Sequence, residues 1–213
     1  MTTRSRRDAT KSTVARKSTG ASLGRPRQFD EDTVLLAAAH AFWQHGYHAT
    51  SVDDICAATG LLRGSLYGAY GDKHGIFVAS LNHYCKTRVA RAEESLAGPA
   101  SREILRRGLA YYFESASDLS LARACFMTNT ALELVPQDHE VATVIESTFR
   151  RMSELWAEAA IRAREAGEFK TKLGKKAVGD YLFCVVQGLR VLGKIYRPDE
   201  LADVVDLALR ALE

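Results

Sequence analysis

The sequence has 213 residues, of which 46% are hydrophobic and 26% charged, and its formal net charge is +3. This composition excludes a chain that is disordered throughout and predicts a globular protein with a sizeable core. No apolar run reaches the roughly 18 residues of a membrane-spanning helix, and the N-terminus lacks the apolar segment of a secretory signal. We therefore expect a cytoplasmic protein without a membrane partner. The four cysteines lie far apart in the sequence, which favours reduced thiols over disulfides.

The positive charge is concentrated at the N-terminus. Residues 1–27 hold eight basic side chains against Asp8, so the other 186 residues carry a net charge of −4. The segment is rich in Ser, Thr, Gly and Ala and has no hydrophobic period, which predicts a flexible basic arm that meets polyanions. Within it, Arg25 and Arg27 of "GRPRQF" are candidates for a DNA minor groove. For residues 1–22 the alternative is a solubilising or vector-derived tail.

From about residue 30 the hydrophobic period is helical, and no β-type alternation persists anywhere. Acidic residues at 30–32 and the apolar residues that follow predict a helix over 31–45, ended by Gly46. Thr50 is the expected N-cap of a second helix, with Asp53 in the capping-box position and Gly60 as the C-cap. A third short helix is expected from Arg63 to about residue 71. Two short helices joined by a glycine-containing turn predict a helix-turn-helix.

The two faces of this third helix differ. Leu62, Leu66 and Tyr70 recur every four residues and are expected to pack inward, against Phe42 and Ile55. The opposite face carries glycine and serine, and small residues permit the close approach that a helix in the major groove needs. The alternative is that the segment is a glycine-rich loop packed under a larger helix.

Four polar side chains of this region are candidate DNA contacts. Arg63 offers a guanidinium fork, Ser65 a hydroxyl, Tyr67 a phenol and Lys73 a charge beside the end of the helix. Residues 28–80 nevertheless carry a net charge of −4, which repels phosphate. Affinity is therefore expected to depend on helix N-terminal amides, on hydroxyls and on the basic arm.

The run from residue 29 to about residue 84 resembles the N-terminal domain of the tetracycline-repressor (TetR) family of bacterial regulators. The similarity lies in "AFWQHGYHATSVDDI" and "TGLLRGSLYGAYGDKHGIF", and "CFMTNTALEL" is similar to a segment in part of the family. The resemblance implies a homodimer that binds a palindromic double-stranded operator, usually represses, and leaves DNA when a small molecule enters the C-terminal domain. Gly68 and Ala69 depart from the family, where many members have larger or polar residues.

Positions that match the family motif take roles from the resemblance alone. It implies that Thr50 meets a phosphate, that Arg63, Gly64 and Ser65 face bases, and that Tyr67 and Lys73 hold the DNA backbone.

The rest of the chain is also predicted to be helical. A long helix runs from Lys73 to the "GP" at 98 and 99, and later helices are expected over 101–117, 122–135, 138–166, 175–195 and 199–212. The segment 177–196 is apolar around most of its circumference, which predicts burial on two fronts, one of them a partner subunit. The expected homodimer interface consists of Leu182, Val185, Leu189, Leu192, Leu201, Val205 and Ala208. The alternative is a monomeric core.

A ligand pocket is expected to be mostly apolar with a few polar groups. All candidates lie in the C-terminal half of the chain. The less polar ones are Phe113, Cys125, Phe126, Met127, Trp156 and Tyr181, and the polar ones are Asn129 and Gln187. Each is also an ordinary core candidate. Cys125 is a further candidate sensor of electrophiles or oxidants, with Arg123 as the nearby charge.

Enzymatic chemistry finds no support in the sequence. The histidines show no H-x-x-x-H or E-x-x-H spacing, "GEFKTKLGKK" departs from a phosphate loop, and no G-x-S-x-G occurs. We therefore expect no catalytic residue, no metal and no cofactor.

These observations predict an all-α regulator that binds specific DNA sequences. Its expected parts are a basic arm over 1–27, a three-helix DNA-binding domain over 28–73, and a helical ligand-binding and dimerisation domain over 74–213. The alternative is a helical ligand-binding or assembly protein in which the helix-turn-helix is only structural.

Overall fold

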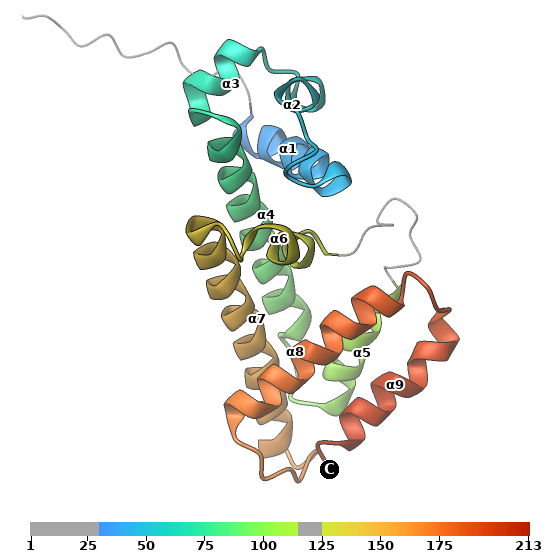
Figure 1. Cartoon of the computed structure of the whole chain (residues 1–213). Helices are drawn as coiled ribbons and strands as arrows, with labels where there is room; N and C mark the ends of the chain where they lie inside the picture. Colours follow the sequence, from blue (N-terminus) through green and yellow to red (C-terminus); the bar gives the residue numbers. More distant parts are fainter. Residues whose placement is uncertain (1–29, 115–124) are drawn as a thin grey trace, which may run out of the picture.

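A computed structural model describes residues 30–114 and 125–213 (Figure 1). Within these two ranges the chain is helical and contains no strand. The helices follow one another as α1 Glu31–His45, α2 Val52–Thr59, α3 Arg63–Tyr70, α4 Lys73–Leu96, α5 Arg102–Glu114, α6 Phe126–Leu134, α7 His139–Glu165, α8 Lys175–Leu192 and α9 Pro198–Arg210. The predicted all-α fold is confirmed, and the ends of α1 and α3 agree with the sequence to within one residue.

Side-chain caps fix most of the helix starts near the N-terminus. Asp30 caps α1 by accepting a hydrogen bond from the N–H of Asp32, and Asp72 caps α4 by accepting one from the N–H of Gly75. At α2 the prediction is one residue off, because Ser51 is the N-cap and pairs with Asp54 in the capping box. Thr50 is instead buried, and its hydroxyl donates to the carbonyl of Gly46 at 2.6 Å.

The structure has two hydrophobic clusters, one above the other along α4 (Figure 1). The lower cluster joins the second half of α4 to α5, α7, α8 and α9, around Leu105, Trp156 and Leu182. The upper cluster joins α1, α2 and α3 to the first half of α4, with α6 and the start of α7 packed on it. α4 therefore belongs to both clusters and connects the helix-turn-helix to the bundle.

The upper cluster crosses the predicted domain boundary at residues 73 and 74. Phe42 from α1 and Phe77 from α4 form an edge-to-face pair with ring centroids 4.9 Å apart, and Phe126 from α6 lies against Phe77 at 6.0 Å. The helix-turn-helix thus shares its core with α6, and the boundary stays a prediction.

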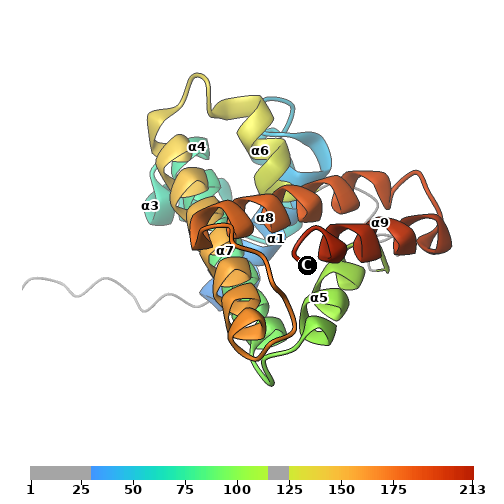
Figure 2. The same cartoon turned by 90° about the horizontal axis from the view of Figure 1, so that it is seen from below.

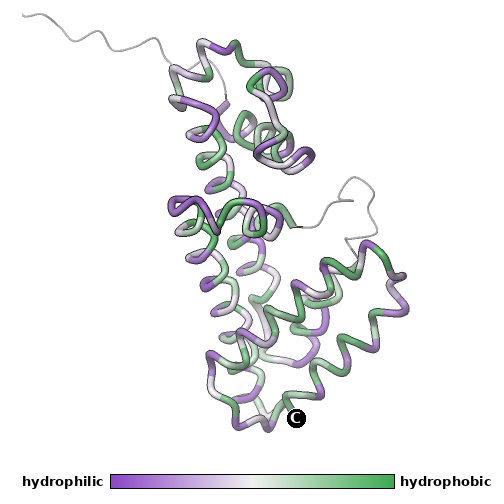
Figure 3. The backbone as a smooth tube through the Cα atoms, viewed as in Figure 1, coloured by the Kyte–Doolittle hydropathy of each residue, from purple (hydrophilic) through white to green (hydrophobic). Residues whose placement is uncertain are grey.

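Helices α8 and α9 lie side by side at the lower end of the molecule (Figure 2). Hydrophobic residues recur along both helices (Figure 3). Most members of the predicted dimer interface are already buried in the chain's own lower cluster, and the interface stays a prediction. The buried members are Leu182, Leu189, Leu201, Val205 and Ala208, and the members packed partly against the cluster are Val185 and Leu192.

A second set of residues on α8 and α9 points to solvent. We call it the outer stripe: Cys184, Gly188, Val191, Val204 and Leu207. The spacing of three and four residues places each helix's members on one face. The sequence predicted that α8 is buried on two sides. In the single chain the outer stripe is exposed to solvent, whereas the face with Leu182 and Leu189 is buried.

No helix in the described ranges combines the length and apolar character needed to cross a bilayer. Within those same ranges, no group of three or more His, Cys, Asp or Glu side chains is placed to hold a metal ion.

Candidate nucleic-acid interface

The helix-turn-helix is held in place by a few buried side chains. Ile55 of α2 and Leu66 of α3 are fully buried in the upper cluster together with Phe42. Leu62 was expected to pack beside them, but it is 79% exposed because it is the N-cap of α3, where the backbone is extended and the side chain leaves the helical face. The inward face of α3 is therefore shorter than its four-residue period predicts.

Two glycines set the path of the chain on either side of α3. Gly60 ends α2 with φ +70°, a left-handed conformation that glycine adopts without strain. Gly75, in the first turn of α4, lies so close to the end of α3 that a Cβ there would come within 1.9 Å of the carbonyl oxygen of Tyr70. Together they fix the angle at which α3 leaves α2 and meets α4.

The outer face of α3 is open. A Cβ added to Gly64 or Gly68 would meet nothing within 4 Å, and Ser65 and Tyr67 are exposed on the same short helix. Leu62 provides no side-chain cap, and the first backbone hydrogen bonds into the helix come from the N–H groups of Ser65 and Leu66. The N–H groups of Arg63 and Gly64 precede these bonds and receive no cap from Leu62, and such a helix N-terminus favours an anion such as phosphate.

Arg63 makes an ion pair that DNA would have to replace. Its guanidinium donates to Asp53 Oδ1 on α2 at 2.7 Å, and this hydrogen bond raises the pKa of Arg63. The two side chains are 55% and 80% exposed. An exposed pair contributes little net stability, so a guanine or a phosphate can replace Asp53 as the partner of the guanidinium with little loss of free energy.

Lys73 lies beside the same surface at the start of α4. Its ammonium sits 4.5 Å from the centroid of the Tyr47 ring and donates to the carbonyl of His48 at 3.4 Å. These contacts direct the charge towards the start of α2. There Ser51 is exposed and its hydroxyl donates to Asp54 Oδ2 at 2.6 Å, whereas Thr50 is buried and its hydroxyl donates to the carbonyl of Gly46. The phosphate contact implied for Thr50 would require its hydroxyl to leave the carbonyl of Gly46, and this contact stays a prediction.

Arg25 and Arg27 lie outside the described residues. Of the other predicted DNA contacts, the structure brings Arg63, Gly64, Ser65 and Tyr67 together on α3, with Lys73 just after it.

Glu133 attaches α6 to the loop between α1 and α2. Its Oε2 accepts from the N–H of Tyr47 at 3.0 Å, and its Oε1 accepts from the N–H of His48 at 2.9 Å. Two charge-assisted hydrogen bonds thus hold the loop that precedes the helix-turn-helix. No motif in the sequence identified this contact, because the partners are backbone groups 85 and 86 residues away.

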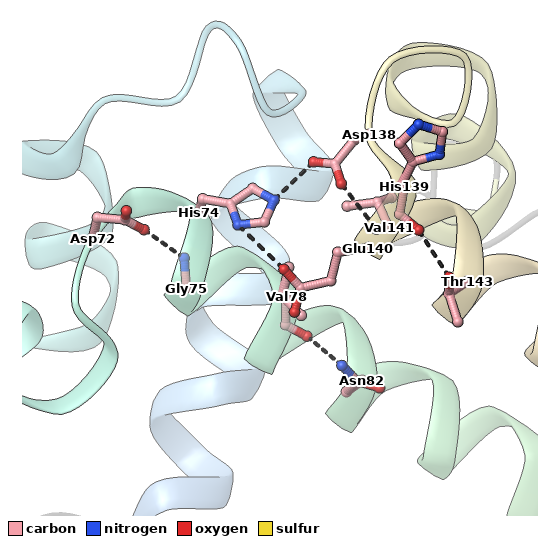
Figure 4. Close-up of polar contacts among 10 residues, drawn as sticks. All are labelled: Asp72, His74, Gly75, Val78, Asn82, Asp138, His139, Glu140, Val141 and Thr143. Atoms are coloured by element: carbon pink, nitrogen blue, oxygen red, sulfur yellow. Dashed lines mark hydrogen bonds and ion pairs between the residues drawn. The ribbon is translucent and has the colours of Figure 1, made fainter.

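A second attachment lies at the start of α4 (Figure 4). His74 Nε2 lies 2.7 Å from Asp138 Oδ2, and His74 Nδ1 lies 3.8 Å from Glu140 Oε2. Asp138 also caps α7, and the N–H of Val141 together with His74 holds the pKa of its carboxyl below the usual value. A change in the position of α6 and α7 would therefore reach the helix-turn-helix through two polar contacts.

The structure does not bring the predicted ligand residues into one site. Phe113 and Trp156 belong to the lower cluster, with Tyr181 packed against it, whereas Cys125 and Phe126 belong to the upper cluster. Asn129 is half-buried on α6. Arg123, the charge expected near Cys125, lies outside the described ranges.

Comparisons with known proteins agree with this geometry. The family model "Bacterial regulatory proteins, tetR family" matches residues 34–80, and "Tetracyclin repressor-like, C-terminal domain" matches residues 101–209. The HTH-type transcriptional regulator YezE of Bacillus subtilis is 30% identical over 198 residues, which is 90% of this chain and 100% of the relative. The HTH-type transcriptional repressor ComR of Escherichia coli is 30% identical over 174 residues, covering 80% and 82% of the two chains.

A solved structure supports the same assignment. A cysteine-substituted form of the TetR family regulator CifR, complexed with 26-bp double-stranded operator DNA, superposes with a TM-score of 0.75 at 28% identity, covering 89% of this chain and 100% of that one. The matched models span both the helix-turn-helix and the bundle. The chain therefore belongs to the TetR family and is a transcriptional regulator with a helix-turn-helix.

Proposed function

We propose that the protein is a homodimeric repressor that binds a palindromic operator and leaves it when a small-molecule effector binds. The observation that carries the proposal is the open outer face of α3, which combines two side-chain-free positions with an uncapped N-terminus. Such a face permits the close approach that base contact in the major groove needs. Repression, rather than activation, is supported by the relative ComR, which is named as a repressor.

The side chains around α3 take distinct roles in this proposal. Arg63, Gly64 and Ser65 face bases, while Tyr67 and Lys73 contact the DNA backbone. At the start of α2, Ser51 exchanges its hydrogen bond to Asp54 for one to a phosphate. Residues 30–80 carry a net charge of −4, so Arg25 and Arg27 are proposed to supply much of the attraction to phosphate from outside the helix-turn-helix.

The outer stripe is the proposed dimer interface. Leu207 and Val191 are 67% and 46% exposed, and they lie on two adjacent helices of one end of the molecule. An apolar face of this kind favours a partner that buries it, and a second copy of α8 and α9 would complete a four-helix arrangement. A two-fold dimer would then present two α3 helices to successive major grooves, about 34 Å apart.

Effector release is proposed to act through α6. This helix packs on the upper cluster and holds the α1–α2 loop through Glu133. A ligand that favours another position of α6 would change the spacing of the two α3 helices and so favour the free protein.

The test is operator binding by matched variants. An operator is first selected from random double-stranded DNA with the wild-type dimer, and affinity is then measured by fluorescence anisotropy at several salt concentrations. Changing Arg63 and Tyr67 together to alanine should weaken binding at least about tenfold. Arg150→Ala is the control, because it also removes an exposed arginine paired with a carboxylate, at 2.5 Å from Glu146, but on α7. Unchanged affinity of the folded double variant would refute the proposal and favour a structural helix-turn-helix.

A further inference from the structure

A cavity of about 250 Å³ is lined by residues of α4, α5 and α8. It borders the lower cluster, on the side of Tyr112 and Ala92. Its lining combines aromatic and basic side chains with one carboxylate: Arg88, Arg91, Ala92, Glu94, Ser95, Tyr111, Tyr112 and Arg190. None of the residues predicted as ligand contacts lines it.

The charge of the cavity is strongly positive. Three guanidinium groups face a single carboxylate, that of the exposed Glu94. Across the described ranges, Arg88, Arg91 and Arg190 make no ion pair, whereas Arg63, Arg102, Arg150 and Arg151 each pair with a carboxylate. The Nε of Arg88 is buried and finds no acceptor within those ranges. A buried donor without an acceptor costs free energy, so an acceptor from a ligand would stabilise this arrangement.

Aromatic rings hold the three guanidinium groups without neutralising them. Arg88 lies 4.7 Å from the ring centroid of Tyr84, Arg190 lies 4.5 Å from that of Tyr112, and Arg91 lies 5.1 Å from that of Tyr111. Burial raises the pKa of Tyr84 to about 12 and also raises the pKa of Tyr112, so both phenols remain neutral. A cation over a ring face keeps its full charge, and the Nε of Arg88 still lacks an acceptor among the described residues. The donors are thus oriented in advance.

We propose that this cavity is the effector site and that the effector is a small organic carboxylate whose carboxyl group is held by Arg88 and Arg190. This inference rests on the proposed regulatory function. A planar carboxylate matches the fork of a guanidinium, and Tyr111, Tyr112 and Ala92 provide apolar contacts for the remainder. A volume of about 250 Å³ suits a short-chain or single-ring acid.

The position of Arg190 links this site to the helix-turn-helix. Gln187, one turn before Arg190 on α8, accepts a hydrogen bond from the hydroxyl of Thr128 in the first turn of α6 at 2.9 Å. The ring of Tyr84, which lies under the guanidinium of Arg88, meets the ring of Phe126 at the start of α6 with centroids 5.3 Å apart. The other end of α6 carries Glu133, which holds the loop between α1 and α2. An anion on Arg190 would therefore act at one end of α6, while the DNA-binding part is attached at the other.

The test measures ligand binding to the full chain by calorimetry and thermal unfolding. The probes are benzoate and hexanoate, with benzamide and hexanamide as neutral controls and inorganic phosphate as a control anion. We expect the carboxylates to raise the Tm and the amides to have no effect. Arg88→Gln or Arg190→Gln should weaken carboxylate binding at least about tenfold, whereas Lys86→Gln, which removes an exposed charge from α4 outside this cavity, should not.

Three results would overturn the proposal: no binding of either carboxylate, equal binding of acid and amide, or tighter binding of phosphate. If the variant at Arg88 or Arg190 fails to fold, Arg91→Gln changes an exposed residue of the same cavity and should still weaken binding. Operator binding is measured in parallel without any probe. Operator binding without carboxylate binding refutes only this inference, whereas loss of operator recognition by the wild type refutes the proposed function.

Discussion

Two leucines on α9, two residues apart, belong to different surfaces: one to the proposed dimer interface and the other to the core of the chain. Leu207 is 67% exposed, whereas Leu209 is fully buried in the lower cluster. Each is changed to alanine in a separate variant. Because residue type, helix and substitution are the same, any difference between the variants reports only where each side chain lies.

The expected magnitudes follow from burial. Burying a whole leucine side chain contributes about 1.5–3 kcal/mol, so Leu207 has roughly 1–2 kcal/mol left to gain in an interface. Two copies meet in a two-fold dimer, and alanine should forfeit about 2–3 kcal/mol in total, which raises the dimer Kd roughly 30- to 150-fold. Leu209→Ala should instead lower the free energy of unfolding by about 2–5 kcal/mol, since it leaves a cavity in the core.

Sedimentation equilibrium over a range of concentrations gives the dimer Kd, and urea unfolding at concentrations where each variant is monomeric gives the stability of the fold. Both are needed because dimerisation itself adds apparent stability. A dimer Kd unchanged by Leu207→Ala, in a folded protein, would show that the outer stripe is not the interface. A large loss of monomer stability in the same variant would show that the Leu207 side chain is buried within the monomer.

Three further changes test other parts of the structure. Gly64→Ala should raise the free energy of unfolding in urea by up to about 1 kcal/mol, because alanine is the better helix former, and should still weaken operator binding measured by anisotropy. Gly75→Ala should lower the free energy of unfolding, since its Cβ would clash with the carbonyl of Tyr70. Glu133→Gln leaves one of its two N–H partners facing an amide NH₂, so deuterium exchange in the 46–48 loop should accelerate, and unchanged exchange would argue against the attachment. Asp138→Asn keeps a good N-cap but removes a carboxylate with a lowered pKa. The stability difference from wild type should therefore be full at neutral pH and shrink as the pH falls below about 4, as measured by urea unfolding at each pH.

The helices and their order could be predicted from the sequence because their signals are local. Caps, helix-ending glycines and the 3.6-residue period act within a few residues, and they located α1 and α3 almost to the residue. The bare face of α3 was also predictable, since Gly64 and Gly68 lie opposite Leu66 on any helix. The errors at Thr50 and Leu62 lie at helix ends, where one residue decides between a helical and an extended backbone.

The tertiary structure alone decided which faces are buried and which distant groups meet. A helix as apolar as α8 does not specify which stripe faces its own core, so packing against α7 and α5 selected Leu182 and left Val191 outside. The arginine cavity needs three helices separated by up to about a hundred residues, and the only local sign was a cation, Arg190, within an apolar helix. Local interactions fix the backbone of each helix, whereas burial depends on which surfaces exclude water together.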